Sequence, residues 1–221
     1  MFPFLKQWSR SVHGDDAPST PELIVAAATA ETGGACTTLT VWRKSLLVSC
    51  KGFTVIDPKG DLLYRVDNYA RTRPQELVLM DKNGNSLLFM HRTKKIRLVD
   101  SWGIYEANDP NGEAKVPKCP IWYMRKNLKM NILSNKSDIL AHIFSGSFDK
   151  KTCYIVKGSY TCKSCKIIYV PTNRTVVEIK RKEVRTKGVQ IGSDVFDLVV
   201  NSGFDTGLAM AFVLLLDQMF S

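Results

Sequence analysis

Histidine is scarce in this chain, and the familiar catalytic motifs are missing. The 221 residues include three histidines, His13, His91 and His142, which stand in unrelated sequence contexts. No GxSxG, HExxH or phosphate-binding P-loop pattern occurs. Asp57 and Asp81 stand at turn positions, where an aspartate caps backbone amides. We therefore expect no catalytic residue, no metal ligand and no cofactor, and a protein that is not an enzyme.

The chain also has no hydrophobic run as long as a typical transmembrane helix. Its longest apolar segment is Asp205–Phe220 (DTGLAMAFVLLLDQMF), uncharged from Leu208 to Leu216. About 15 helical residues span roughly 23 Å, whereas a bilayer core is about 30 Å thick. No Lys or Arg follows the segment to anchor it among headgroups. With Asp205 as N-cap, we expect a helix over 205–220 buried inside the protein, and a transmembrane anchor is the alternative.

An export signal is missing from the start of the sequence. MFPFLKQWSRS has no continuous hydrophobic region and no small-residue cleavage site, and position 2 is not the glycine that N-myristoylation needs. The six cysteines are then expected to be reduced thiols. Residues 1–35, with little periodicity, are interpreted as a mobile tail ahead of one domain over 36–221. We expect a cytoplasmic protein, with peripheral plasma-membrane attachment or the nucleus as further locations.

What the chain does have is positive charge, unevenly placed. The net charge is +10, and residues 1–35 hold two basic against four acidic side chains, so the remainder carries +12. Residues 151–187 hold ten basic against two acidic side chains. Such a surface suits an anionic partner, with ordinary solubility charge as the alternative. The predicted anionic-lipid patch consists of Lys163, Lys166, Lys180, Lys182, Arg185 and Lys187.

Two details refine that patch. On a strand, alternate residues share a face, so Lys180 and Lys182 are expected to point together, with Arg181 opposite. Nucleic acid fits the charge, but aromatic stacking platforms are not interleaved with it, so nucleic acid is not the expected partner. Anionic membrane lipid or an unidentified protein is expected instead, bound by a monomer.

Short β-rich segments with turn signals follow one another from Thr37 onward. The predicted strands are Thr37–Trp42, Phe53–Asp57, Leu62–Asp67, Glu76–Met80, Leu87–Arg92, Ile96–Val99, Trp102–Ala107, Pro120–Lys126, Ile139–Ser145, Cys153–Ser159, Lys166–Val170, Thr175–Lys182 and Ser193–Val200. About a dozen strands at short spacing favour a sandwich or a closed barrel. The interior of so large a barrel needs an apolar filling, and the C-terminal helix has the right length and character.

Cys162-Lys163-Ser164-Cys165 is the sharpest local motif. A structural zinc site needs about four ligands, and no second pair of ligands is spaced to supply them. A thioredoxin-type motif begins a helix, whereas this one lies between two predicted strands. We interpret it as a hairpin turn with two thiols, and redox sensing or metal binding remain alternatives.

Several segments together resemble the plant LURP-one-related (LOR) family. They are the run Thr40–Leu47 (TVWRKSLL), Gly52–Val55, Asp57-x-x-Gly60, Tyr64–Tyr69 (YRVDNY), Leu77–Asp81, Gly84, Leu87-Leu88, Leu98 with Trp102-x-x-Tyr105, and Gly203–Asp205. The Arg65-Val66-Asp67-Asn68-Tyr69 piece is the most specific. The resemblance covers residues of about 37 to 220, and the Cys162–Cys165 turn and the 108–118 segment depart from the family pattern.

The resemblance implies a fold and a class of function. The implied fold is that of Tubby C-terminal domains and phospholipid scramblases, a twelve-stranded β-barrel around a hydrophobic C-terminal helix. The family offers no established catalytic residues to transfer. It implies a binding or adaptor module for anionic phospholipid such as phosphoinositide, linked to plant defence or signalling. The alternatives are a membrane-inserted scramblase-like protein and a membrane-tethered transcription regulator.

Overall fold

The computed structural model describes residues 35–47, 50–68, 75–93, 100–107, 119–127, 138–146, 151–182, 192 and 194–221. These residues form twelve strands and one helix. The elements are β1 (Thr37–Trp42), β2 (Lys51–Ile56), β3 (Leu62–Asn68), β4 (Glu76–Asp81), β5 (Ser86–Arg92), β6 (Ser101–Glu106), β7 (Trp122–Lys126), β8 (Ile139–Ser145), β9 (Thr152–Ser159), β10 (Ser164–Tyr169), β11 (Arg174–Arg181), β12 (Val195–Val200) and α1 (Thr206–Phe220).

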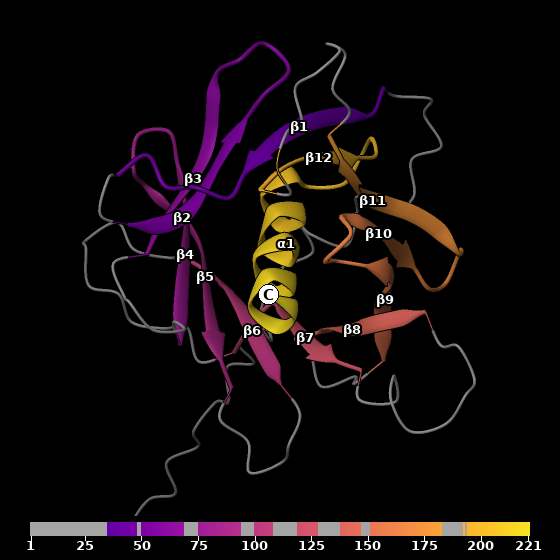
Figure 1. The fold of residues 1–221 in the computed structure, drawn as a ribbon. Helices are drawn as coiled ribbons and strands as arrows, with labels where there is room; N and C mark the ends of the chain where they lie inside the picture. The colour runs from indigo at the N-terminus through magenta and orange to yellow at the C-terminus, as the bar shows by residue number, and fades with distance from the viewer. Residues whose placement is uncertain are drawn as a thin grey trace, which may run out of the picture.

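The strands form a closed antiparallel barrel in which each pairs with its neighbours in the chain (Figure 1). Closure comes from the first and last strands, which pair from Thr37 opposite Val200 to Trp42 opposite Val195. A closed sheet has no free edge to recruit another chain. The expected barrel is thus confirmed. The predicted strand Ile96–Val99 and the predicted tail 1–35, apart from residue 35, lie outside the described residues.

Helix α1 runs through the middle of the ring of strands (Figure 1). Its N-cap is Asp205, whose Oδ1 accepts a hydrogen bond of 2.6 Å from the backbone N–H of Leu208. From Leu208 to Leu216, each residue is at most 6% exposed. A helix that is apolar all round is stable only when every side is covered, and here the barrel covers it. The buried-helix prediction is confirmed, and no helix in the described residues is both long and apolar enough to span a bilayer.

Two hairpin turns repeat the same local chemistry. The Oδ1 atom of Asp57 accepts from the backbone N–H groups of Lys59 and Asp61, at 2.8 and 2.9 Å. Asp81 does the same for Asn83 and Asn85, both at 2.8 Å. Hydrogen bonding from Asn85 lowers the pKa of the Asp81 carboxyl below its usual value. The sequence interpretation of both aspartates as turn-forming residues is confirmed.

The barrel has two ends, which the helix distinguishes. At the entry end, where α1 begins, Tyr64 Oη lies 2.7 Å from Thr206 Oγ1. At the exit end, where α1 finishes, Arg43 Nε lies 3.1 Å from Asp217 Oδ1. The β2–β3, β4–β5 and β10–β11 turns lie at the entry end, and the β1–β2 loop and the β9–β10 turn lie at the exit end.

Candidate functional site

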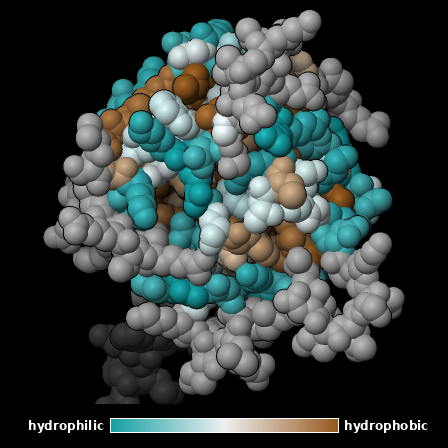
Figure 2. Space-filling view, in the orientation of Figure 1, coloured by the Kyte–Doolittle hydropathy of each residue, from teal (hydrophilic) through white to brown (hydrophobic). Residues whose placement is uncertain are grey.

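The β1–β2 loop at the exit end presents apolar side chains to solvent. Trp42 is 38% exposed, Leu46 50% and Leu47 38%. They are three of the five large hydrophobic residues that are exposed in the described part of the chain. The coloured residues of the face shown in Figure 2 are mostly hydrophilic, with hydrophobic residues in patches and recesses. Exposed apolar side chains grouped on one loop are typical of a surface that contacts a partner.

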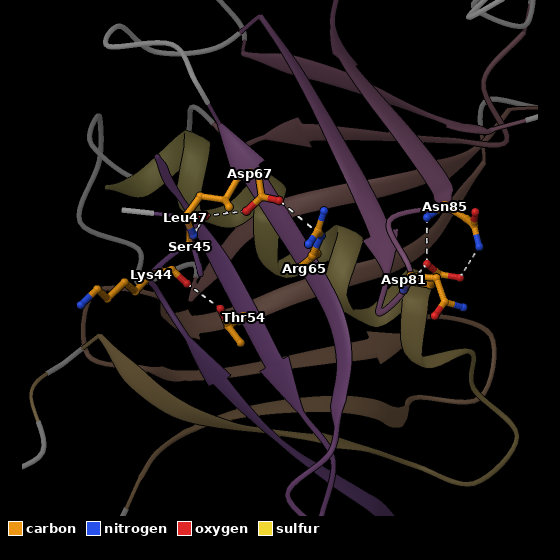
Figure 3. A network of polar contacts seen from close by, with 9 residues as sticks. Lys44, Ser45, Leu47, Thr54, Arg65, Asp67, Asp81 and Asn85 are labelled. Carbon is orange, nitrogen blue, oxygen red and sulfur yellow. Dashed lines mark hydrogen bonds and ion pairs between the residues drawn. The ribbon is translucent and has the colours of Figure 1, made fainter. Parts of the chain in front are cut away.

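A buried hydrogen-bonded anchor fixes that loop to the barrel wall (Figure 3). Ser45 is 5% exposed, and its hydroxyl donates to Asp67 Oδ1 on β3 at 2.5 Å. The same Ser45 Oγ accepts from the backbone N–H of Leu47 at 3.0 Å. Gly52 permits the close approach, because a Cβ there would lie 1.8 Å from the Val66 carbonyl oxygen and 3.2 Å from Ser45 Cβ. These contacts therefore hold the Ser45 side chain inward, while the adjacent Lys44 and Leu46 are exposed.

The Asp67 carboxylate is balanced by Arg65 on the same strand. The side chain of Asp67 is 2% exposed, and its Oδ2 lies 3.3 Å from Arg65 Nε. Both atoms are buried and neither makes a hydrogen bond, so the contact is an ion pair without hydrogen-bond geometry. A buried carboxylate without a partner is strongly destabilising. The Arg65-Val66-Asp67 part of the family motif thus holds the loop; the sequence singled out these residues but not this role.

The first arm of the loop is fixed by two further contacts. Thr54 on β2 donates from Oγ1 to the carbonyl oxygen of Lys44 at 2.7 Å (Figure 3). Lys44 Nζ lies 5.3 Å from the centroid of the Trp42 ring, within the range of a cation–π contact. Lys44 and Trp42 therefore place a cation and an apolar ring together at the start of the loop that carries the exposed Leu46 and Leu47.

The lysines predicted on β10 and β11 are on the barrel exterior, but each has a carboxylate partner. Lys166 Nζ and Lys180 Nζ lie 3.4 and 2.5 Å from the two oxygens of Glu178. Lys182 Nζ lies 2.8 Å from Asp197 Oδ1. The hydrogen bond from Lys180 lowers the pKa of Glu178 below its usual value. Lys180 and Lys182 share the outer face as expected, and their positive charge is partly neutralised there.

Lys163 is an exception that the sequence did not reveal. It is 6% exposed, and its Nζ lies 3.5 and 4.7 Å from the centroids of the Tyr160 and Phe196 rings. Burial lowers its pKa below the usual value for lysine. Lys163 lies in the β9–β10 turn with a positive backbone φ of 51°, and its side chain is buried there. Lys163 is therefore not part of an exposed lipid patch, whereas Arg185 and Lys187 lie outside the described residues.

A buried polar cluster surrounds the end of α1. Asp217 is 5% exposed; its Oδ1 accepts hydrogen bonds from Tyr160 Oη at 3.1 Å and from Ser221 Oγ at 2.8 Å. Arg43 supplies an ion pair from the start of the β1–β2 loop. Burial, followed by the nearby Asp217 charge, raises the pKa of Tyr160 well above its usual value. These contacts tie the helix, the loop and the β9–β10 turn together.

The Cys162–Cys165 motif is a hairpin turn whose two thiols point into different environments. Cys162 is exposed, and hydrogen bonding with Ser159 and Thr161 lowers the pKa of its thiol. Cys165 is 2% exposed, and burial raises the pKa of its thiol to about 12. Both are free thiols. Among the residues that the structure describes, no cluster of three or more His, Cys, Asp or Glu side chains could hold a metal ion.

A cavity of about 590 Å³ opens at the entry end, and sequence reasoning did not find it. Its lining comes from seven strands, the residue before β7, the β10–β11 turn, the loop before α1 and the first turn of the helix. The lining residues are Tyr64, Leu87, Leu88, Glu106, Ile121, Trp122, Tyr154, Tyr169, Thr172, Arg174, Val176, Asn201, Ser202, Gly203, Phe204, Asp205, Gly207 and Leu208. Residues that meet only through barrel closure are far apart in the chain, so no local pattern marks them.

Tyr154 is the centre of an aromatic cluster on the cavity wall. Its ring centroid lies 5.4 Å from that of Trp122, 5.3 Å from that of Tyr169 and 5.7 Å from that of Phe204. Such edge-on and tilted contacts suit the quadrupoles of aromatic rings. Tyr154 is 8% exposed, and burial raises the pKa of its hydroxyl to about 12.

That pKa predicts a loss of stability in alkali. The unfolded phenol titrates near 10, so the contribution of Tyr154 is complete below pH 10 and is lost as pH rises toward 12. We expect the free energy of unfolding of Tyr154→Phe to fall less between pH 8 and pH 11 than that of the wild type, by about 1 kcal/mol. Urea unfolding followed by circular dichroism at both pH values measures this. Equal alkaline losses in the two proteins would contradict it.

These features define the class of protein: a closed antiparallel barrel that encloses its own C-terminal helix. An X-ray structure of a protein from Arabidopsis thaliana matches it with a TM-score of 0.56, and the match covers 82% of this chain and 90% of that one. Because the two sequences are 17% identical, this likeness shows the shared fold alone.

The sequence comparisons identify the family. The family model described as LURP-one-related matches residues 37–217. The chain is 81% identical to protein LURP-one-related 17 of Arabidopsis thaliana over 221 residues, which is 100% of both chains. It is 43% identical to protein LURP-one-related 8 of the same plant over 187 residues, covering 84% of this chain and 88% of the relative. The chain belongs to the LURP-one-related family, as its motifs predict.

Proposed function

We propose that the protein is a non-enzymatic module that docks reversibly on anionic phospholipid membrane through its exit end. The observation that carries the proposal is the anchored β1–β2 loop, which holds Leu46 and Leu47 out to solvent beside Trp42 and Lys44. Apolar side chains that enter the acyl boundary, flanked by cations at headgroup level, are the usual components of an interfacial contact.

The expected strength of this contact is moderate. Full burial of one leucine side chain is worth about 1.5–3 kcal/mol, and each nearby cation adds about 1 kcal/mol on a charged leaflet. Lys44 and Lys51 have no carboxylate partner among the described residues, whereas Lys182 must share its charge with Asp197. The sum supports a peripheral, salt-sensitive association. Phosphoinositides, which carry several phosphate charges on one headgroup, are the favoured lipid.

The buried helix argues against the scramblase-like alternative. Insertion of α1 into a bilayer would remove residues Leu208–Leu216 from the barrel interior, where each is at most 6% exposed. The inward faces of the strands would then lose their apolar partners. Docking through the loop leaves the core intact, so it is the function that the geometry supports better.

Vesicle flotation with and without the loop leucines tests this proposal. We expect wild-type protein to float with phosphatidylcholine vesicles that contain a phosphoinositide and to stay at the bottom with phosphatidylcholine alone. Replacing Leu46→Ser and Leu47→Ser together should weaken flotation about tenfold or more, because it removes the apolar part of the contact. The matched control is Val170→Ser, which changes an apolar residue of similar exposure (41%) at the entry end.

Three outcomes separate the claims. Equal flotation with phosphatidylserine vesicles of matched charge would show binding to anionic membrane in general and would remove the phosphoinositide claim. Loss of flotation in Val170→Ser to the same extent would show that the exit end is not the docking surface. An absence of flotation with every anionic vesicle would remove the membrane proposal.

A further inference from the structure

We propose that the entry-end cavity binds a small, elongated and largely apolar aromatic molecule, uncharged as a whole, with a hydrogen-bond acceptor at one end and a donor at the other. The proposal does not depend on membrane docking, because the cavity lies at the opposite end of the barrel from the β1–β2 loop.

The volume of the cavity and its apolar lining determine the size and the character of the central part of the ligand. A volume of about 590 Å³ lies within the range of roughly 300–1,000 Å³ that small-molecule sites occupy. The lining includes Trp122, Tyr154, Tyr169 and Phe204, three of which pack their rings against Tyr154. Aliphatic side chains complete the apolar lining: Leu87, Leu88, Ile121, Val176 and Leu208. Aromatic walls of this kind favour flat rings that stack or meet them edge-on.

Three of the polar side chains in the lining, Tyr64, Asn201 and Asp205, are already engaged within the protein. The Asp205 carboxylate caps α1, and the Tyr64 hydroxyl bonds to Thr206. The Asn201 amide donates to the Thr175 carbonyl, while its Oδ1 lies 3.1 Å from Cys36 Sγ. A ligand would have to break one of these contacts in order to use the same atoms.

Two charged side chains in the lining have no such engagement. Arg174 begins β11 and Glu106 ends β6, and neither has an ion-pair partner among the described residues. Four strands, β7 to β10, separate β6 from β11 around the barrel, so the two charges come from widely separated parts of the wall. Arginine only donates hydrogen bonds, and an ionised glutamate only accepts them. Together they define an acceptor-binding end and a donor-binding end.

This pair of opposite charges also sets the overall charge of the molecule. A strongly anionic ligand would gain from Arg174 and lose to Glu106, and a strongly cationic one would do the reverse. An uncharged molecule with a carbonyl at one end and a hydroxyl at the other can hydrogen-bond to both side chains while its rings contact the apolar lining. That complementarity selects the ligand class.

Naphthalene probes with one or both polar ends test the proposal on the full chain. The two-ended probe is 6-hydroxy-2-acetonaphthone, the acceptor-only probe is 2-acetonaphthone, and the donor-only member is 2-naphthol. We expect fluorescence titration to show that the two-ended probe binds most tightly. Arg174→Ala should weaken both ketone probes about three- to tenfold and leave 2-naphthol unchanged. Glu106→Ala should weaken both hydroxyl probes to a similar extent and leave 2-acetonaphthone unchanged.

Two further variants make the result decisive. Val176→Phe adds a ring to the cavity wall and should weaken all three probes, with circular dichroism to confirm that it folds. The matched control is Arg181→Ala, an exposed arginine at the other end of the same strand, which should bind all three probes like the wild type. The proposal is overturned if no probe binds, if Arg174→Ala and Arg181→Ala behave alike, or if Arg174→Ala and Glu106→Ala each weaken all three probes equally.

Discussion

Leu214→Asp is expected to abolish the folded protein rather than to weaken one function of it. Leu214 is 0% exposed in the middle of α1, and the barrel wall surrounds it on every side. An aspartate there must either keep its charge in an apolar interior or take up a proton, and it also leaves most of the leucine's volume empty. The combined cost of about 5 kcal/mol or more is comparable with the whole stability of a domain, which is usually about 5–15 kcal/mol.

Circular dichroism and limited proteolysis of the purified chain measure this outcome. We expect Leu214→Asp to be largely insoluble, or soluble without a cooperative unfolding transition. The control is Leu214→Met, which conserves volume and polarity and should cost less than about 1.5 kcal/mol. If α1 served only as an attachment to something else, the barrel of Leu214→Asp would unfold at the same temperature as the wild type.

Local patterns account for most of what the sequence predicted. Alternating apolar residues and turn motifs such as Asp57–Gly60 and Asp81–Gly84 depend on neighbours within a few positions, so they are legible without a structure. The helix was equally clear, because Leu208–Leu216 is an unbroken apolar run with an N-cap ahead of it. Closure of the barrel followed from these segments once something apolar was needed inside it.

The features that sequence reasoning missed depend on contacts between distant parts of the chain. Glu178 meets Lys166 only because the register of β10 and β11 places the two residues opposite each other, whereas Lys180 lies two residues from Glu178 on the same strand. Ser45 and Asp67 meet because the β1–β2 loop bends back over β3. The entry-end cavity requires the whole ring of strands. The Lys166–Glu178 pair, the Ser45–Asp67 pair and the cavity lining have no spacing that a linear pattern could detect.

Lys163 illustrates a different limit. A lysine within a turn is normally solvated, so the sequence predicts that its charge lies on the surface. Here the Nζ lies against the rings of Tyr160 and Phe196, and the nearby Asp217 carboxylate offsets part of the cost of burial. Two opposite charges, each unfavourable alone in the interior, can be stable there as a pair. Only the distance between them in the folded structure shows that they form one.

Asp217→Ala is expected to produce the second largest effect, because this carboxylate is the acceptor that the whole exit-end cluster shares. Its loss leaves the buried Tyr160 hydroxyl without a partner, removes the countercharge near Lys163 and frees Arg43. Breaking a buried pair typically costs about 3–5 kcal/mol. Since the Arg43 side chain is 41% exposed and can turn to water, we expect the lower end of that range. Urea unfolding followed by tryptophan fluorescence measures the change.

Two milder variants show which part of Asp217 matters. Asp217→Asn keeps an oxygen that can accept from Tyr160 but removes the charge, so it isolates the effect on Arg43 and Lys163. Tyr160→Phe removes the hydroxyl and should cost about 1 kcal/mol, because one hydrogen bond is lost while the carboxylate keeps Ser221 and Arg43. If charge pairing dominates, Asp217→Asn will fall close to Asp217→Ala. If all three variants unfold within about 0.5 kcal/mol of the wild type, the cluster does not hold the helix in the barrel, and apolar packing along α1 suffices.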